Sequence, residues 1–292
     1  MQTITTPEGL NALENGNKFI GTLPTMKKSK ITFNGENNIL YCDDDVVLTD
    51  CNINFNGSNS VVFLSSSKKY IMHIYINNDS AMYIGKGTTF NKLLHFILSE
   101  RKHIFVGDDC MFSLDIWMRN GEPHLIYDEE TRMRKNLSKS IFLGDHVWLG
   151  QHALILKGTK IHSGSIVAAG SIVAGKTISS NESWAGIPSK KIADKLFWDR
   201  PSVHTYTEKQ TANSMRFKDD RYIYKYNKKQ YIPFEEIDAE IDSLKSAEEK
   251  FKYLMTIHDN TDKNRFSYRP MDAEPEPESK PKFSLFGNSK KK

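Results

Sequence analysis

The chain has few cysteines, little excess charge and no long apolar segment, and each absence narrows what it can be. Its 292 residues include three isolated cysteines, Cys42, Cys51 and Cys110, without the spacing of a metal site. We therefore expect free thiols in a reducing, cytoplasmic setting. No apolar run is long enough to span a bilayer, and no secretory signal opens the chain. A net charge of +4 gives no indication of the concentrated basic surface that nucleic acid requires.

A six-residue repeat between Ile141 and Lys176 is the most informative pattern present. An aliphatic residue stands at every sixth position, namely Leu143, Leu149, Ile155, Ile161, Val167 and Val173. A small or β-branched residue follows four places after each of the first five: Val147, Ala153, Thr159, Ser165 and Ser171. A period of six matches neither an α-helix nor an ordinary strand. It is typical of a triangular β-solenoid, so we predict three stacked pairs in a dry core: Leu143 on Ile161, Leu149 on Val167, and Ile155 on Val173.

A longer and looser repeat precedes the hexads. The segment Ile31-Thr-Phe-Asn-Gly-Glu-Asn returns as Ile53-Asn-Phe-Asn-Gly-Ser-Asn, and weaker echoes follow. We interpret these segments as wider coils of the same solenoid, with Asn and Gly in turns that need a positive φ. An antiparallel meander of hairpins is the alternative for residues 31–110. The solenoid domain is predicted to span residues 31–195, after an N-terminal segment of residues 1–30.

The pattern becomes helical after the solenoid. Residues 192–198 suit a short closing helix, which opens a helical extension of residues 196–270. One amphipathic helix is predicted over residues 235–255, because its apolar residues recur at helical spacing: Ile237, Ile241, Leu244, Phe251 and Leu254. Residues 271–292 are rich in Pro, Glu, Lys and Ser and are predicted to be a disordered tail. The apolar residues and lysines at its end could give weak contact with an anionic membrane, at the inner face, or with a partner.

Val106, Phe112 and Met118 also follow a six-residue step, which a loop of residues 119–139 interrupts before Leu143 resumes it. Such a loop on a rigid scaffold commonly carries function. Three motifs follow in order: Glu122-Pro-His-Leu-Ile-Tyr-Asp128, Ile141-Phe-Leu-Gly-Asp-His-Val-Trp-Leu-Gly150 and Gly186-Ile-Pro-Ser-Lys190. Together they resemble the hexapeptide-repeat acyltransferases, and most closely the sugar and capsular-polysaccharide O-acetyltransferases. The resemblance covers about residues 104–195. It departs from the family pattern at Glu122, where an aspartate is usual.

The resemblance implies a mainly β protein with a left-handed parallel β-helix, an extruded catalytic loop and a C-terminal helical extension. Its reaction would transfer an acetyl group from acetyl-CoA to a hydroxyl of a cell-surface (capsular) polysaccharide or its sugar unit. His124 would be the general base in a direct attack, because a neutral imidazole can take the hydroxyl proton. Glu122 or a backbone carbonyl would orient its ring. Trp148, Trp117 and Glu122 are candidate acceptor-binding residues, although both tryptophans also suit packing.

The resemblance also implies a homotrimer with the coenzyme in a groove between subunits. Small residues at 168–170 would leave room for the pantetheine arm, although any tight solenoid turn also needs small residues. Lysines could face the coenzyme phosphates as point charges. The expected coenzyme-binding residues are Gln151, Ala168, Ala169, Gly170, Lys176, Pro188, Lys190 and Lys191. The register of Lys176 is open, because Ala174-Gly-Lys176 is one residue longer than the usual family segment.

Three histidines invite a metal interpretation, but their positions argue against it. His146 and His152 occupy the same place in successive hexads, which puts them on adjacent corners where they do not converge within one chain. With His162 they could meet only across a subunit interface, so no metal site is expected.

Two other functions stay open: an N-acyltransferase on an amino sugar nucleotide or a small-molecule acetyltransferase of the serine kind, and a non-catalytic solenoid. The loop with His124 argues against a non-catalytic solenoid.

Overall fold

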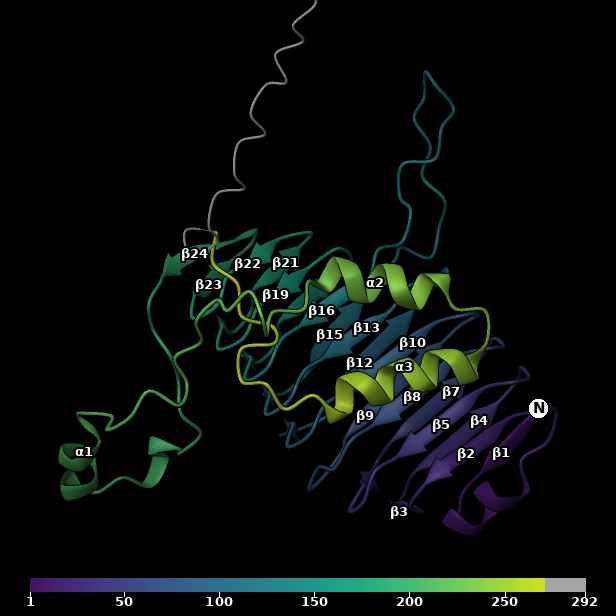
Figure 1. The fold of residues 1–292 in the computed structure, drawn as a ribbon, viewed down its shortest axis with the longest axis horizontal. Coiled ribbons are helices and arrows are strands. Elements are labelled where there is room, and N and C mark those ends of the chain that lie inside the picture. The colour runs from purple at the N-terminus through teal and green to yellow at the C-terminus, as the bar shows by residue number, and fades with distance from the viewer. Residues whose placement is uncertain (271–292) are drawn as a thin grey trace, which may run out of the picture.

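The computed structural model describes residues 1–270 and forms a left-handed parallel β-solenoid with three faces (Figure 1). The chain runs repeatedly from face 1 to face 2, then to face 3 and back to face 1. The corners are named by the faces they join: corner 1–2, corner 2–3 and corner 3–1. The fold predicted from the six-residue repeat is confirmed. The tail predicted for residues 271–292 lies outside the described residues.

Each face is built from strands of successive coils. Face 1 contains β1 (Gln2–Ile4), β4 (Lys30–Phe33), β7 (Asn52–Phe55), β9 (Met72–Ile76), β12 (Leu94–Leu98), β15 (Ile116–Arg119), β18 (Leu154–Leu156) and β21 (Ile172–Ala174). Face 2 contains β2 (Lys18–Gly21), β5 (Ile39–Cys42), β8 (Val61–Leu64), β10 (Ala81–Ile84), β13 (Ile104–Val106), β16 (Ile141–Leu143), β19 (Lys160–Ile161) and β22 (Thr177–Ile178). Face 3 contains β3 (Thr25–Lys27) and β6 (Val47–Thr49), then β11 (Thr89–Phe90), β14 (Met111–Phe112), β17 (Trp148–Leu149), β20 (Ile166–Val167), β23 (Ser183–Gly186) and β24 (Ser189–Ala193).

The apolar ladders form the interior as predicted. Parallel pairing sets Leu143 opposite Ile161, Leu149 opposite Val167, and Ile155 opposite Val173. All of these side chains are fully buried, as are the small residues that follow them in each hexad. Each coil therefore covers the apolar edge of the next, and the coils stabilise one another through shared burial.

The earlier, wider coils are parallel, which excludes the hairpin meander. Ile31 pairs with Ile53 in a parallel ladder, so one period of the looser repeat is one full coil. Asn37 and Asn59 take the predicted positive φ, at 56° and 61°. Gly35 serves a different purpose: a Cβ there would lie 2.2 Å from the carbonyl oxygen of Gly57 in the next coil. Glycine is thus needed at this corner for close approach between coils.

The solenoid begins earlier than the predicted boundary at residue 31. Strand β2 pairs in parallel with β5, and β3 pairs with β6. Strand β1 joins β4 in antiparallel register, and the 3₁₀ helix η1 (Pro7–Ala12) connects β1 to the first coil. These segments were too short to repeat visibly in the sequence, because only one coil precedes residue 31.

The loop is an insertion at corner 1–2. Met118 pairs with Ile155, and Ile155 pairs with Val173 in the following coil. More residues separate Met118 from Ile155 than separate Ile155 from Val173, although each pair lies one coil apart. The additional residues form the segment that leaves the coil. Figure 1 shows this segment projecting away from the solenoid body between β15 and β16.

The end of the solenoid differs from the prediction. Ile161 pairs with Ile178 and not with Ser179, so the last coil is one residue shorter than the hexads would make it. The predicted closing helix of residues 192–198 is wrong. Residues 189–193 instead form β24, which folds back antiparallel onto β23. An added strand of this kind ends the stack without leaving the backbone groups of β23 unpaired.

The C-terminal extension covers the outside of face 2, where α2 (Phe234–Ser243) and α3 (Ala247–Asp259) cross several strands (Figure 1). The single helix predicted over residues 235–255 is wrong. The backbone is extended at Leu244, and a capping box of Ser246 with Glu249 starts α3. The apolar spacing continues across the break, which is why it suggested one helix. None of the helices within residues 1–270 is long and apolar enough to cross a membrane.

The strands of face 2 from β5 to β16 are buried on both sides for this reason. Its outward residues form an apolar layer beneath the helices, which includes one aromatic side chain per coil: Tyr41, Phe63, Tyr83, Phe105 and Phe142. The rings of this aromatic column lie 4.2–6.0 Å apart from coil to coil. They would be exposed without α2 and α3, so the extension is part of the same fold and not a separate domain.

A buried arginine fixes the end of the extension. Arg265 is 1% exposed, and its guanidinium contacts Asp145 at 3.0 and 2.8 Å. Asp145 also accepts from the N–H of Asp108 in the preceding coil, so the extension connects coils that are already stacked. By contrast, η2 (Val203–Thr205) and α1 (Glu208–Ser214) lie in a lobe away from the solenoid (Figure 1).

His162 lies in the contact between the extension and the solenoid. Its ring stacks on Phe234 of α2 with centroids 4.8 Å apart, and its Nδ1 donates to the carbonyl oxygen of Phe266 at 3.3 Å. Burial lowers the pKa of His162 to about 4. Nearby Lys160 and Glu235 form an ion pair with each other.

We expect acid to weaken this contact. The unfolded chain protonates His162 below about pH 6.5, while the folded chain resists until about pH 4, so stability is complete above pH 6.5 and is lost as the pH falls. Between pH 7.5 and 5 the loss should reach about 2 kcal/mol from this residue. Denaturant unfolding of His162→Gln should show a shallower pH dependence than the wild type. The same change at exposed His204 should leave the pH dependence unchanged; equal slopes for wild type and His162→Gln would contradict the assignment.

Candidate functional site

The inserted loop is a hairpin with a defined base. Tyr127 and Arg134 form an antiparallel bridge, and the turn beyond them is closed by Asp128, whose backbone N–H donates to Met133. Asn136 is buried and holds the strand that carries His124. Its Nδ2 donates to the carbonyl oxygen of His124 at 2.7 Å, and its Oδ1 accepts from the N–H of Ile126 at 2.9 Å.

Glu100 attaches this hairpin to the solenoid. It lies at corner 1–2 in the coil before the loop, where it accepts from Arg134 at 2.5 Å and from the hydroxyl of Ser138 at 2.7 Å. These bonds, that of Arg134 first, lower the pKa of Glu100 to about 2. The carboxylate is therefore ionised at any physiological pH, and the base of the loop stays charged and hydrogen-bonded.

His124 itself is exposed, in a bend of the first arm of the hairpin, before the bridge residue Tyr127. Within residues 1–270 neither of its ring nitrogens makes a hydrogen bond. Glu122 does not orient it here, because that carboxylate pairs with Lys157 at 2.5 Å, and the hydrogen bond lowers the pKa of Glu122. The candidate base is thus held by its backbone while its ring remains free to meet a ligand or another chain.

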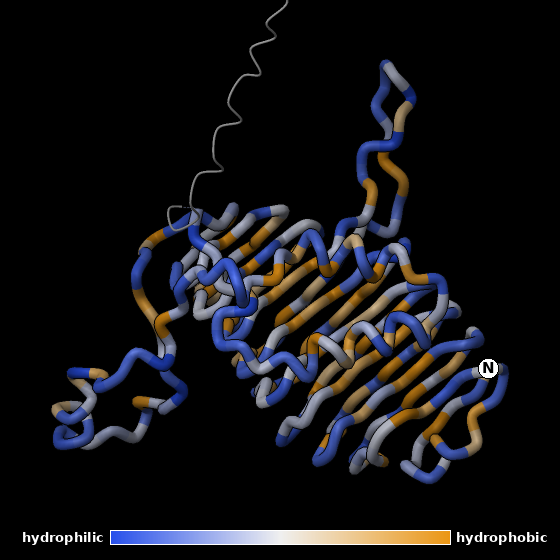
Figure 2. Tube along the Cα trace, viewed as in Figure 1, coloured by the Kyte–Doolittle hydropathy of each residue, from blue (hydrophilic) through white to orange (hydrophobic). Residues whose placement is uncertain are grey.

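Apolar side chains around His124 are left uncovered. Five of them are between 52% and 67% exposed: Leu125, Ile126, Tyr127, Met133 and Leu137. Figure 2 shows these apolar stretches on both strands of the projecting hairpin. A cluster of this kind on a protruding element is typical of a surface that another molecule covers.

The two candidate tryptophans lie on different faces. Trp148 opens β17 on face 3, half buried, and packs against Trp198 of the extension with centroids 5.9 Å apart. Trp117 lies on face 1 in β15, 37% exposed, and its ring stacks on that of His95 at 4.0 Å. The loop leaves from corner 1–2, which is opposite face 3. One chain therefore does not bring His124 and Trp148 together.

Most of the expected coenzyme residues gather at one end of the molecule. Gln151 and residues 168–170 lie at corner 3–1, where the N–H of Gly170 donates to the carbonyl of Gln151 at 2.8 Å. A Cβ at Gly170 would meet nothing within 4 Å, so this corner is open. Pro188 and Lys190 belong to the β23–β24 hairpin that ends face 3.

Two expected lysines are placed less favourably. Lys191 pairs with Glu182 at 3.2 Å, which neutralises its charge. Lys176 lies at corner 1–2, between β21 and β22, and so does not join the residues at corner 3–1. Its register is now defined, because its carbonyl accepts from the N–H of Lys160 in the adjacent coil at 2.8 Å.

His146 and His152 occupy adjacent corners, as their spacing indicated, with φ of 54° and 59°. His146 is a packing residue: its ring is stacked between Trp198 and Tyr222, and Nδ1 lies 2.7 Å from Asp109. His152 is exposed and lies 3.0 Å from Asp115.

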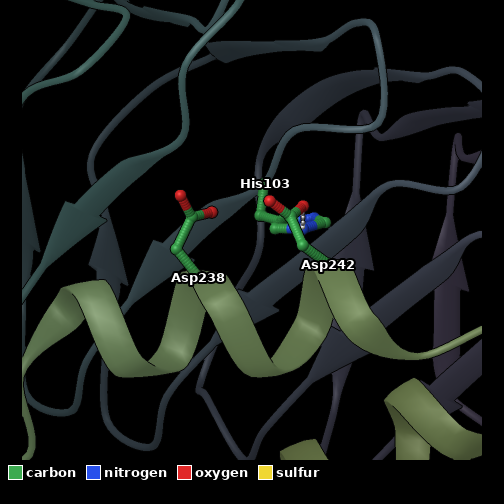
Figure 3. Close-up of side chains that lie close together, drawn as sticks. All are labelled: His103, Asp238 and Asp242. Atoms are coloured by element: carbon green, nitrogen blue, oxygen red, sulfur yellow. Dashed lines mark hydrogen bonds and ion pairs between the residues drawn. The ribbon is translucent and has the colours of Figure 1, made fainter.

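One group within residues 1–270 has the composition of a metal site: His103, Asp238 and Asp242 (Figure 3). Nδ1 of His103 accepts from the N–H of Ala81 at 3.1 Å, so Nε2 carries the proton and donates to Asp242 at 3.1 Å. Lys102 already pairs with Asp242. The group is therefore a hydrogen-bonded anchor of α2 on the solenoid, with no lone pair on His103 left for a metal.

Several residues that shape the site gave little sign in the sequence. Glu100 and Asn136 hold the loop, and Trp198 supports Trp148, but single residues far apart in the chain carry no periodic signal. Outside the site, the start of α3 did leave a local signal, because the Ser-x-x-Glu spacing of Ser246 and Glu249 is that of a capping box.

No family model matches the chain. It is 27% identical over 141 residues to the polysialic acid O-acetyltransferase of Neisseria meningitidis; the match covers 48% of this chain and 63% of that protein, less than two thirds of its length. Among solved structures it is similar to the polySia-specific acetyltransferase NeuO, with 29% identity and a TM-score of 0.59 over 68% of this chain and 93% of that one. The polysialic acid O-acetyltransferase OatWY has 25% identity and a TM-score of 0.53, covering 67% and 97%.

Replacing Asn136 should loosen the strand that carries His124. Asn136→Ala removes the hydrogen bonds to His124 and Ile126, each worth about 1 kcal/mol, together with a longer one from Arg134, so hydrogen exchange of the Ile126 and Lys135 amides should accelerate about tenfold or more. The midpoint of global unfolding should change little, because the loop lies outside the coils. Asn91→Ala, at an exposed corner, is the matched control. Unchanged exchange in Asn136→Ala would show that other contacts hold the loop.

Proposed function

We propose that this chain, which belongs to the hexapeptide-repeat, left-handed β-helix acyltransferase superfamily, transfers an acetyl group from acetyl-CoA to a hydroxyl of an acidic capsular polysaccharide. The observation that carries this proposal is the anchored hairpin, which presents His124 outside a solenoid whose sequence and fold are similar to polysialic acid O-acetyltransferases. The acceptor for which these relatives are named suggests that the acceptor here is a sialic acid polymer.

His124 acts as the general base in this proposal. Its imidazole removes the proton of the acceptor hydroxyl as that oxygen attacks the thioester carbonyl carbon of acetyl-CoA. The resulting tetrahedral oxyanion collapses, the C–S bond breaks, and the coenzyme sulfur takes the proton back from the imidazolium. No acyl-enzyme is needed, and the histidine ends in its starting state.

Corner 3–1 is suited to the thioester. Of the three backbone N–H groups at residues 168–170, those of Ala168 and Gly170 donate within the solenoid, whereas that of Ala169 has no acceptor within residues 1–270. A Cβ at Gly150 would lie 2.5 Å from the Ala169 nitrogen, so glycine there preserves the shape of the corner. We infer that the Ala169 N–H stabilises the oxyanion or holds the pantetheine arm, and that Lys190 faces the coenzyme phosphates.

The active site is shared between copies of the chain. His124 projects from corner 1–2, while Trp148 and corner 3–1 belong to the opposite side of the solenoid. A ring of three copies would set the hairpin of one chain on the tryptophan and coenzyme corner of the next, and would cover the exposed apolar residues of the hairpin. The assembly is therefore proposed to be a homotrimer.

Removal of the base should abolish most of the activity. His124→Ala should lower kcat for acetyl transfer by about 10²–10⁴, with a nearly unchanged KM for acetyl-CoA and an unchanged melting temperature, because the side chain is exposed. Release of free coenzyme A thiol in the presence of polysialic acid measures turnover. His204→Ala, at another exposed histidine, should behave as the wild type. Normal turnover by His124→Ala would place the base elsewhere.

A shared site predicts complementation between two defective variants. His124→Ala and Trp148→Ala should each be poorly active alone. After the two variants are unfolded together in equal amounts and reassemble at random, about a quarter of all sites combine one intact histidine with one intact tryptophan. Activity should rise to about that fraction of the wild-type value. No rise, with mixed trimers demonstrated by mass spectrometry, would mean that both residues act within one chain or that one of them is dispensable.

A further inference from the structure

A hollow of about 580 Å³ lies at corner 1–2 beside the base of the hairpin. It is lined by Leu244 and Lys245 of the connection between α2 and α3, and by Asp79 and Arg101 of two successive coils. Glu100, which holds Arg134 and Ser138 of the hairpin, also lines it. The hollow therefore adjoins the element that carries His124, on the side toward the N-terminus of the solenoid.

Cations outnumber the free carboxylates in this hollow. Two of its acids already have partners on the protein, since Glu100 binds Arg134 and Asp242 binds Lys102. Asp79 is the remaining carboxylate of the lining. Against it stand the three cations Arg101, Lys245 and Lys250.

The arrangement of these cations favours an anionic ligand. Lys250 is 2% exposed; its ammonium donates to the carbonyl of Asn59 at 3.2 Å and lies 3.9 Å from Asp79. Arg101 shares Asp79 with it, at 3.4 Å, and its side chain is 78% exposed. Lys245 is exposed, and within residues 1–270 its ammonium has no partner. Burying the charge of Lys250 costs free energy that one shared carboxylate offsets incompletely, and a second anion would lower that cost.

We propose that this hollow binds a carboxylate of an acidic polysaccharide, at a sugar unit removed from the one that is acetylated. The inference rests on the proposed function, because the hollow adjoins the hairpin where the acceptor would react. A polymer with one carboxylate per unit can occupy the hollow and reach His124 at once, whereas a short acceptor cannot. Arg101 and Lys245 provide the exposed contacts, and Lys250 provides fixed positive charge beneath them.

The test compares two double variants that lose the same charge. Arg101→Gln with Lys245→Gln removes the exposed cations of the hollow, and Lys228→Gln with Lys229→Gln removes two exposed lysines of the extension outside its lining. Binding of fluorescently labelled polysialic acid to each protein is followed by anisotropy, without acetyl-CoA. Two partly exposed charge contacts are together worth about a five- to tenfold change, so the Kd of the first variant should rise by that factor. The control variant should stay within about twofold of the wild type.

Kinetics on the same proteins separates the hollow from the catalytic site. In the first variant the KM for polysialic acid should rise, while kcat, the KM for acetyl-CoA and the turnover of a sialic acid dimer should be unchanged. Equal polymer binding by both variants, or no polymer binding by the wild type, overturns the subsite. A raised KM for acetyl-CoA with unchanged polymer binding would instead assign the hollow to the coenzyme phosphates. If the variant with Arg101→Gln and Lys245→Gln binds the polymer as the wild type does and still acetylates it, the subsite is overturned while the proposed enzymatic function is retained.

Discussion

The rest of the structure depends on the stacking of equivalent residues in successive coils. Each strand lies about 4.8 Å from the next, so an apolar side chain is covered only if the next coil presents one at the same place. The same constraint acts on the corners, where residues at equivalent places in successive coils take a positive φ. At corner 1–2 these residues include Asn37, Asn59 and Asp79; at corner 2–3 they include Asp109 and His146. An insertion is tolerated only where the chain can leave and return to the same register, as it does between Met118 and Ile155.

The sequence predicted what repeats and missed what occurs once. The hexads specified the stacked pairs from Leu143 to Val173 because every coil imposes the same choice. The aromatic column at 41, 63, 83 and 105 repeats as well, and it could have indicated that face 2 is covered. The break at Leu244 was hidden because apolar spacing alone does not distinguish one helix from two in sequence. A closing helix was wrongly predicted after the last coil. The chain instead turns back after Gly186 because no further coil stacks on β23, and this tertiary effect leaves no local pattern in the sequence.

The candidate site was predictable in composition but not in placement. The order of the loop and the following coil identified His124 and Trp148, yet only the topology shows that they lie on opposite sides of one chain. Likewise Lys176 and the small residues at 168–170 are close in sequence and lie at different corners, since β21 crosses face 1 between them. In a solenoid, residues only a few positions apart in the sequence can lie at different corners, separated by the full width of a face. Site residues must therefore be compared by corner as well as by motif.

The covering of the faces decides how two copies can complete a site. Helices cover face 2, and the segment around Trp198 and Arg200 packs on face 3. Within residues 1–270 no element covers face 1, where Trp117, Leu154, Leu156 and Ile172 remain partly exposed. Face 1 is bounded by corner 1–2, with the hairpin, and by corner 3–1, with the small residues at 168–170. We infer that copies packed through face 1 about a common axis would bring each hairpin against the coenzyme corner of its neighbour. The apolar residues of face 1 and of the hairpin would then be buried in the same contact, so assembly and completion of the site would be one event.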